Sequence, residues 1–260
     1  MWGEGFVLAR GKRLEYRCWG ERPGDGPGDG RCLVLLHEGL GCVALWKGFP
    51  AALNTVTGLP VMAFSRAGYG FSDPDELPRP LDWMTREAVE VLPEVLTAFG
   101  LDAPVLVGHS DGATIAAIHA GLVGRVCGVV LIAPHVFTED VGLTEIARAD
   151  AEFGASDMAV RMGKYHRDPV ASFRGWADAW LSPGFVGWNV EDALDGINAP
   201  VLVIQGREDQ YGTLAQVEAV RARVPGNVRE LILEGCRHAP HLEQGEAVVR
   251  EIDEFVQNNA

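Results

Sequence analysis

The chain has 260 residues, of which 47% are hydrophobic and 22% charged, and its net charge is −14 because 36 acidic residues outnumber 22 Lys and Arg. A chain of this size buries roughly 70–75% of its unfolded surface, so wholesale disorder is excluded and one to two domains are expected. The acidic balance excludes nucleic acid and membrane surfaces as expected partners, whereas a small anionic substrate stays open.

Short apolar runs alternate with helical patterns along the chain. Gly5–Ala9 and Arg13–Trp19 predict an antiparallel hairpin, and Pro23–Gly30 predicts an exposed turn. Runs of Val, Leu and Ile, typical of strands buried on both faces, follow at Cys32–Leu36, Val61–Phe64, Val105–Val107, Val126–Ala133, Val201–Gln205 and Val228–Leu233. Helical patterns lie between them at Ala44–Thr57, Asp82–Phe99, Gly112–Leu122, Leu214–Arg223 and Gln244–Val256. This alternation predicts an α/β doubly wound sheet.

One connection breaks the alternation. The segment between Ala133 and Pro200 has no obvious strand and is rich in aromatic residues. A gap this long without structure of its own is improbable in a compact domain. We therefore expect a core domain of residues 1–134 and 200–260, with residues 135–199 forming a helical cap, or lid, folded over one edge of the sheet.

The sequence offers little sign of disulfides, metals or a membrane segment. Five cysteines at irregular spacing, without a C-x-x-C pair, argue against a disulfide framework or a zinc ribbon. No signal peptide is visible, and the apolar run Val126–Pro134 is far shorter than the ~18 residues of a membrane span. We expect a cytoplasmic protein with no cofactor and no metal.

The strongest local signal is Gly108-His109-Ser110-Asp111-Gly112, a G-x-S-x-G motif. It follows a predicted strand and opens a predicted helix, the context in which a serine is exposed on a strained turn. The two glycines keep side chains clear of that turn, and the helix N-terminus stabilises developing negative charge. The motif predicts Ser110 as a nucleophile; the alternative is an idle serine in a Gly-rich turn.

A serine nucleophile needs a base and an acid that orients the base. Asp209 lies just past the strand Val201–Gln205 and is the candidate acid, with Glu208 as its rival and a solvated turn carboxylate as the alternative. His238 lies in the loop after Val228–Leu233 and is the candidate base. Its rivals are His241, His109 and His37.

These segments, together with Leu35-Leu36-His37-Glu38-Gly39 and Gly68-Tyr69-Gly70-Phe71-Ser72, resemble the α/β-hydrolase fold superfamily over almost the whole chain. The resemblance implies a mostly parallel eight-stranded sheet flanked by helices, with a helical cap inserted after the sixth strand. It also implies a catalytic triad formed by Ser110, Asp209 and His238.

The resemblance further implies an oxyanion hole made of the backbone N–H groups of Gly39 and Asp111. The chain departs from the family at Glu38, where glycine is usual. A carboxylate aimed at the oxyanion would oppose the transition state, so we expect Glu38 to point away and brace a loop. Only the N–H of Asp111 is needed, which leaves its side chain free to bond locally.

Candidates for substrate binding are Glu38, His135, Trp176 and Trp180. The two tryptophans are four residues apart and share a helix face, where they either hold the cap to the core or form a pocket wall. His135 directly follows the sixth predicted strand. Arg66, at the end of the fourth, is expected on the surface, with a substrate carboxylate as the alternative.

We therefore expect a serine hydrolase that acts on a small or aromatic carboxylic ester through an acyl-enzyme intermediate. The alternative is hydrolysis of a thioester, a lactone or the carbon–carbon bond of a ring-cleavage product by the same triad. A more remote alternative is a non-catalytic ligand-binding protein of the same fold. The expected partner is a small-molecule substrate, and a homodimer is left open.

Overall fold

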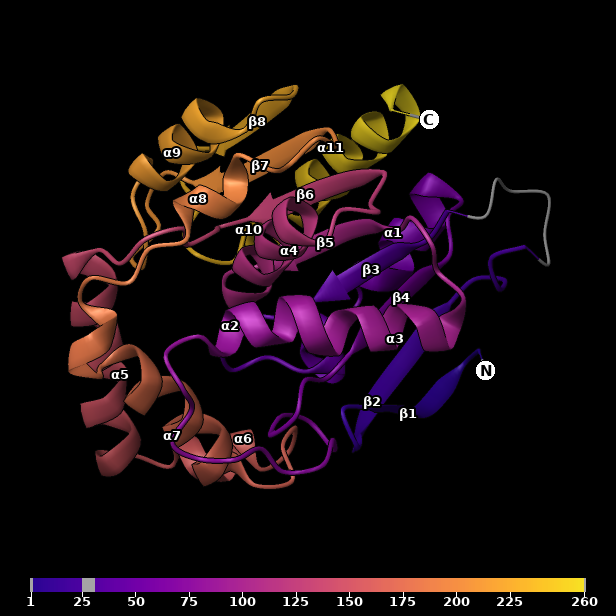
Figure 1. The fold of residues 1–260 in the computed structure, drawn as a ribbon. Coiled ribbons are helices and arrows are strands. Elements are labelled where there is room, and N and C mark those ends of the chain that lie inside the picture. Colours follow the sequence, from indigo (N-terminus) through magenta and orange to yellow (C-terminus); the bar gives the residue numbers. More distant parts are fainter. Residues whose placement is uncertain (1, 25–30, 260) are drawn as a thin grey trace.

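A computed structural model describes residues 2–24 and 31–259. Eight strands of these residues form one sheet in the order β1-β2-β4-β3-β5-β6-β7-β8 (Figure 1). The strands are β1 (Glu4–Ala9), β2 (Lys12–Trp19), β3 (Leu33–Leu36), β4 (Val61–Phe64), β5 (Val105–His109), β6 (Gly128–Ile132), β7 (Val201–Gly206) and β8 (Val228–Leu233). β2 runs antiparallel to β1 and β4, and the other neighbouring strands are parallel. The expected eight-stranded, mostly parallel sheet is confirmed.

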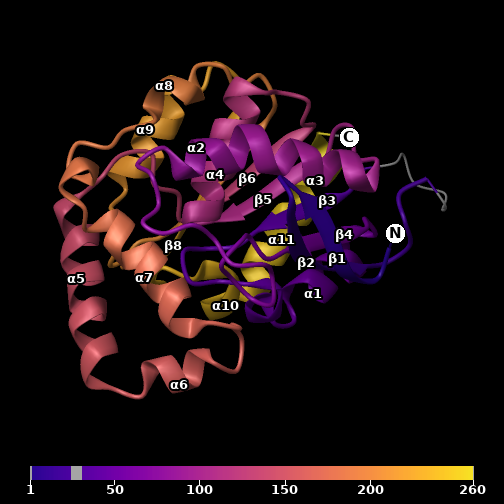
Figure 2. The same cartoon turned by 60° about the horizontal axis from the view of Figure 1, so that its bottom comes forward.

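Helices cover both faces of the sheet (Figure 2). One face carries α2 (Trp83–Arg86), the π-helical turn η2 (Glu87–Val91), α3 (Leu92–Phe99), α4 (Asp111–Leu122), α8 (Glu191–Leu194) and α9 (Ala215–Arg223). The opposite face carries α1 (Phe49–Thr57), α10 (Pro240–Glu243) and α11 (Gly245–Asn258). In β3, Val34 and Leu36 pack into the first layer while Leu33 and Leu35 pack into the second. The apolar runs lack polar alternation because both faces of the strands are buried.

Two predicted helices differ from the structure. Ala44–Thr57 is split into a 3₁₀ turn, η1 (Val43–Trp46), and α1, because Lys47 adopts a positive φ of 51° between them. The segment predicted at Asp82–Phe99 is helical from Trp83 onward, but its centre is the π-helical turn η2. Pro93, the second residue of α3, has no N–H to donate, which favours such irregular winding in the preceding turn. The predicted turn at Pro23–Gly30 lies, from residue 25 onward, outside the described residues.

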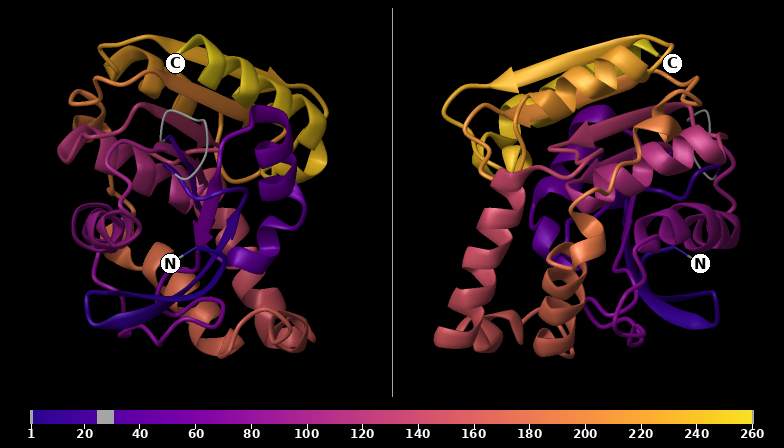
Figure 3. Two further views of the ribbon diagram at one scale, coloured as in Figure 1. Left: turned by 90° about the vertical axis from the view of Figure 1, so that its right-hand side faces the viewer. Right: turned by 60° about the vertical axis from the view of Figure 1, so that its left-hand side comes forward.

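Between β6 and β7 the chain forms an insertion (residues 135–199) whose regular elements are helical, apart from one isolated β-bridge between Phe137 and Asn189. It contains α5 (Asp140–Ala155), α6 (Met158–Met162), α7 (Pro169–Trp180), the 3₁₀ turn η3 (Pro183–Phe185) and α8. Figure 3 shows α5 and α7 projecting from one end of the sheet. The insertion covers the carboxyl ends of the strands: α7 meets the loop after β3 at Gly39, and α5 meets the loop after β7 at Tyr211. The division into a core domain and a cap stays a prediction.

The described residues contain no helix with the length and apolar character that a bilayer crossing requires.

Close backbone packing at the start of α4 yields a stability prediction. A Cβ added to Gly112 would collide with the carbonyl oxygen of Leu36 and lie 2.7 Å from that of His37. We expect Gly112→Ala to lower the free energy of unfolding by about 2 kcal/mol or more, because rigid backbone must move apart. Denaturant unfolding followed by circular dichroism measures this change.

The matched control is Gly154→Ala near the end of α5, where an added Cβ meets open space. This change should raise the free energy of unfolding by about 0.5–1 kcal/mol, the helix-propensity gain of alanine over glycine. Equal effects of the two substitutions would contradict the steric account of Gly112.

Candidate active site

Ser110 sits on the sharp turn between β5 and α4. Its backbone angles, φ 53° and ψ −121°, are unusual for a residue other than glycine, and such strain concentrates at functional sites. Its N–H donates to the carbonyl of Ile132 at 2.9 Å, and its own carbonyl accepts from Ala113 at 2.8 Å. A Cβ at Gly108 would press on the backbone of Ala113, so the turn requires glycine there as it does at Gly112.

The structure brings Ser110, His238 and Asp209 together. His238 Nε2 lies 3.0 Å from Ser110 Oγ, and His238 Nδ1 lies 2.8 Å from Asp209 Oδ2. An ionised carboxylate only accepts, so Nδ1 carries the proton and Nε2 is free to accept from the serine hydroxyl. Burial acts to raise the pKa of Asp209, but the charge and hydrogen bond of His238 outweigh it and hold that pKa below its ordinary value. This is the geometry of an activated serine.

Two residues that the sequence reasoning missed position the Asp209 carboxylate. Gln205 Nε2 donates to Asp209 Oδ2 at 2.8 Å, and the backbone N–H of Tyr211 donates to Oδ1 at 2.8 Å. The sequence signal that could have indicated Gln205 is a single polar residue at the end of an otherwise apolar predicted strand. The rival acid Glu208 accepts from the N–H of Cys236 at 2.9 Å, so it braces the neighbouring loop.

The rival histidines have other partners. His109 Nε2 lies 2.7 Å from the carbonyl oxygen of His238 and donates to it, since a carbonyl only accepts. Its Nδ1 faces Glu38 Oε2 at 3.5 Å. His241 is buried against aromatic rings, with its ring centroid 5.0 Å from that of Trp46.

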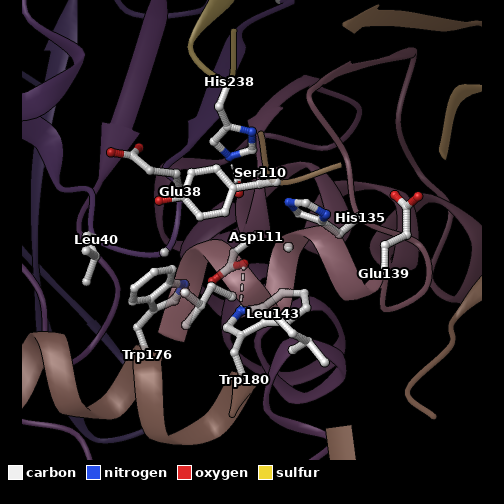
Figure 4. A pocket seen from close by; sticks show the side chains of 14 residues that line it. Glu38, Leu40, Ser110, Asp111, His135, Glu139, Leu143, Trp176, Trp180 and His238 are labelled. Carbon is white, nitrogen blue, oxygen red and sulfur yellow. Dashed lines mark hydrogen bonds between the residues drawn. The ribbon is translucent and has the colours of Figure 1, made fainter. Parts of the chain in front are cut away.

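Glu38 lines the pocket, but its side chain extends away from Ser110 (Figure 4). Burial acts to raise the pKa of Glu38, yet the facing imidazole of His109, with smaller contributions from His37 and His241, outweighs it and holds the pKa well below its usual range. The carboxylate is therefore ionised and directed at His109, in the loop-bracing orientation that the sequence suggested.

The position of Arg66 differs from the one expected from the sequence. The sequence favoured a surface position, but the side chain is buried, with 2% exposed. Its guanidinium donates to the carbonyl of His37 and, at 3.0 Å, to that of Glu38. Its backbone N–H donates to His37 Nε2 at 3.0 Å. Arg66 lies inside the protein because it satisfies the carbonyls of the loop after β3 that leads to Gly39.

The two residues predicted to supply oxyanion donors, Gly39 and Asp111, line the same cavity as Ser110. The N–H of Asp111 opens α4, where a helix offers it no acceptor. In the described part of the chain the N–H of Gly39 has no acceptor either. A Cβ at Gly39 would collide with the indole of Trp176 and lie 3.0 Å from Asp111 Oδ2, so only glycine fits there.

A cavity of about 110 Å³ opens over Ser110 and His238. The four predicted substrate-binding residues all line it: Glu38, His135, Trp176 and Trp180 (Figure 4). The His135 ring lies 5.5 Å from that of Trp180, centroid to centroid. Burial, assisted by the nearby His238, lowers the pKa of His135 to about 3, so this ring is neutral near pH 7. The walls are mainly aromatic and aliphatic.

The buried His135 predicts a pH-dependent loss of stability. Its pKa is about 3 in the folded chain and ~6.5 when unfolded, so between these values the unfolded chain binds more protons. Stability that is fully present above the unfolded pKa is lost as the pH falls toward 3, by up to about 1.4 kcal/mol per pH unit. We expect His135→Gln to lose less stability than the unmodified chain between pH 6 and pH 4. Parallel pH profiles of the unfolding free energy would contradict this.

Comparison with known proteins gives relatives of several activities. A proline iminopeptidase from Heyndrickxia coagulans is 32% identical over 124 residues, which is 46% of this chain and 38% of that protein. The chain thus matches well under half the length of this relative. An enol-lactonase from Burkholderia xenovorans LB400 superimposes with a TM-score of 0.75 at 19% identity, over 97% of this chain and 100% of the other. A thermophilic esterase from Thermogutta terrifontis gives 0.73 at 20% identity, over 98% of both chains.

The two solved structures agree with this chain in fold. The family comparison goes further, because residues 33–251 match the alpha/beta hydrolase family. That match includes the turn of Ser110, the strand ends that carry Asp209 and His238, and the whole insertion. By this match and this fold, the chain belongs to the alpha/beta hydrolase family.

Proposed function

We propose that the chain is a serine hydrolase that cleaves small or aromatic carboxylic esters through an acyl-enzyme intermediate. One observation carries the proposal. Asp209, His238 and Ser110 form a continuous chain of hydrogen bonds that ends in a cavity with aromatic walls. Membership of the alpha/beta hydrolase family supports it.

In the first step, Ser110 Oγ attacks the ester carbonyl carbon while His238 Nε2 accepts the hydroxyl proton. The carbonyl oxygen becomes an oxyanion that accepts hydrogen bonds from the N–H groups of Gly39 and Asp111. Asp209 holds the imidazole in its tautomer and stabilises the imidazolium.

In the second step, the tetrahedral intermediate collapses and the alcohol leaves with the proton from His238. The acyl group stays on Ser110 as an ester. Water then attacks this ester, gives a proton to His238, and releases the carboxylic acid as Ser110 recovers its hydrogen.

The cavity sets the size of the acyl group. About 110 Å³ is small beside the ~300–1,000 Å³ of pockets that hold drug-sized ligands. Trp176, Trp180 and Tyr211 offer aromatic faces and Leu143 offers an aliphatic one. These walls favour short-chain or aryl acyl groups over long chains.

Replacing the nucleophile tests the reaction. We expect Ser110→Ala to lower kcat by at least about 10³-fold, because the attacking oxygen is removed. The measurement is hydrolysis of p-nitrophenyl esters from acetate to decanoate, together with the benzoate. Acetate, butyrate and benzoate should be cleaved faster than decanoate.

Ser156→Ala is the matched control, since this exposed serine lies outside the cavity. It should keep the rate of the unmodified protein. Undiminished turnover by Ser110→Ala would refute the proposal. If no ester is cleaved but a fluorophosphonate labels Ser110, the ester proposal is replaced by hydrolysis of a thioester, a lactone or a carbon–carbon bond. If no ester is cleaved and Ser110 is not labelled, it is replaced by a non-catalytic binding protein.

A further inference from the structure

Asp111 is a buried residue, and one of its two carboxylate oxygens receives no hydrogen bond from the described residues. The residue has only 1% of its surface exposed. Its Oδ1 accepts a hydrogen bond from Trp180 Nε1 at 3.2 Å, whereas Oδ2 has no hydrogen-bond partner in the described residues. A buried carboxylate oxygen without a donor costs free energy, so a donor from outside the chain would stabilise it.

This oxygen lies beside the proposed oxyanion hole. Oδ2 is 3.0 Å from the position that a Cβ on Gly39 would occupy, and the Trp176 indole reaches the same point. Figure 4 shows Asp111 below Ser110, between the side chains of Trp176 and Trp180. The backbone N–H of the same residue is a proposed oxyanion donor. A ligand group bound at Oδ2 is therefore only a few bonds from the acyl carbon.

The cavity around it is acidic. Three carboxylate residues line it, Glu38, Asp111 and Glu139, and no Lys or Arg occurs among its described lining residues. His135 is neutral, because burial lowers its pKa to about 3. The lining therefore supplies negative charge and no cationic side chain.

The other two carboxylates have different surroundings. Glu38 has 29% of its side chain exposed and faces His109 Nδ1 at 3.5 Å. Glu139 accepts from the N–H of Thr213 at 2.9 Å, from its hydroxyl at 2.7 Å and from Gln216 Nε2 at 2.7 Å. Asp111 differs from both because it is almost fully buried while its Oδ2 has no donor in the described residues.

The nearby buried cations are also engaged elsewhere. Arg66 donates to the carbonyls of His37 and Glu38, and Arg79 donates to Tyr69 and Asp75. Burial raises the pKa of Asp111, which the more distant Arg66 and Arg79 oppose without contacting it. A cationic ligand at Oδ2 would supply the missing counter-charge.

We propose that Asp111 recognises a protonated primary or secondary amine close to the scissile carbonyl, so that the substrates are α- or β-aminoacyl compounds. The amine donates to Oδ2, while the apolar part of the acyl group packs on Trp176 and Trp180. This inference rests on the proposed hydrolase function and narrows its substrate class. Acyl groups that carry a carboxylate are disfavoured, because the described lining has no cation to receive one.

Three benzyl esters of nearly the same shape test this: those of alanine, propionic acid and 2-hydroxypropionic acid. The released benzyl alcohol gives kcat/KM for each. We expect the unmodified protein to prefer the alanine ester over the propionate ester by about 10-fold or more, since a charge-assisted hydrogen bond is worth about 1.5–3 kcal/mol. The hydroxy ester should resemble the propionate ester.

Two variants test whether Asp111 causes the preference for the alanine ester. Asp111→Asn keeps the size of the side chain and an oxygen for Trp180, and it should bring the alanine-to-propionate ratio close to one, mainly through KM for the alanine ester. Glu139→Gln removes a charge from the same cavity and should retain the ratio. A ratio near one in the unmodified protein, equal rates for the hydroxy and amino esters, or the same fall in both variants would each overturn the proposal.

A binding measurement separates this inference from the hydrolase proposal. Calorimetry with Ser110→Ala should show tighter binding of alaninamide than of propionamide, and the double variant Ser110→Ala/Asp111→Asn should lose the difference. Equal binding of the two amides to Ser110→Ala overturns amine recognition. If no ester is cleaved and a fluorophosphonate leaves Ser110 unlabelled, the hydrolase proposal fails, while the amide pair still decides whether Asp111 binds an amine.

Discussion

The close approach of two backbone segments at the β5–α4 turn is the constraint on which the site depends. The start of α4 packs directly on the end of β3, with Gly112 against the carbonyl of Leu36. That contact leaves no room for a side chain, and it brings the loop after β3 beside the turn that carries Ser110. The strained backbone of Ser110 persists because β5, β6 and α4 hold both sides of the turn. This steric contact therefore places Ser110 beside the loop after β3, which carries the proposed oxyanion donor Gly39.

The insertion supplies residues that contact the loop after β3 and the start of α4. Trp176 lies against Gly39, and Trp180 donates to the Asp111 side chain, so α7 contacts both residues that carry the proposed oxyanion donors. Movement of α7 would alter the walls of the cavity and the surroundings of those donors together. Under the proposed function, substrate choice and oxyanion binding would both depend on these two tryptophans of α7.

Charge is distributed unevenly around the reacting atoms. The cations near the loop after β3 satisfy carbonyl groups or structural carboxylates, and the nearest extra imidazole, His135, is neutral near pH 7. The cavity is left with carboxylates and, in the residues that the structure describes, no lysine or arginine. In the two proposals Asp111 would serve twice, because its N–H would bind the oxyanion and its carboxylate would bind an amine of the acyl group.

The sequence by itself determined the sheet, the order of its helices and three residues that meet at strand ends, because apolar periodicity and turn chemistry are local properties. Only the tertiary structure decided which groups each side chain meets. It buried Arg66 against the loop after β3, placed Gln205 and Tyr211 on Asp209, and left one oxygen of Asp111 without a partner among the described residues. The contact of Arg66 with Glu38 joins residues 28 apart in the chain, and even the short-range contacts to Asp209 depend on how side chains are oriented after packing. They follow from the path of the chain and from steric exclusion, which exist only once the layers have packed.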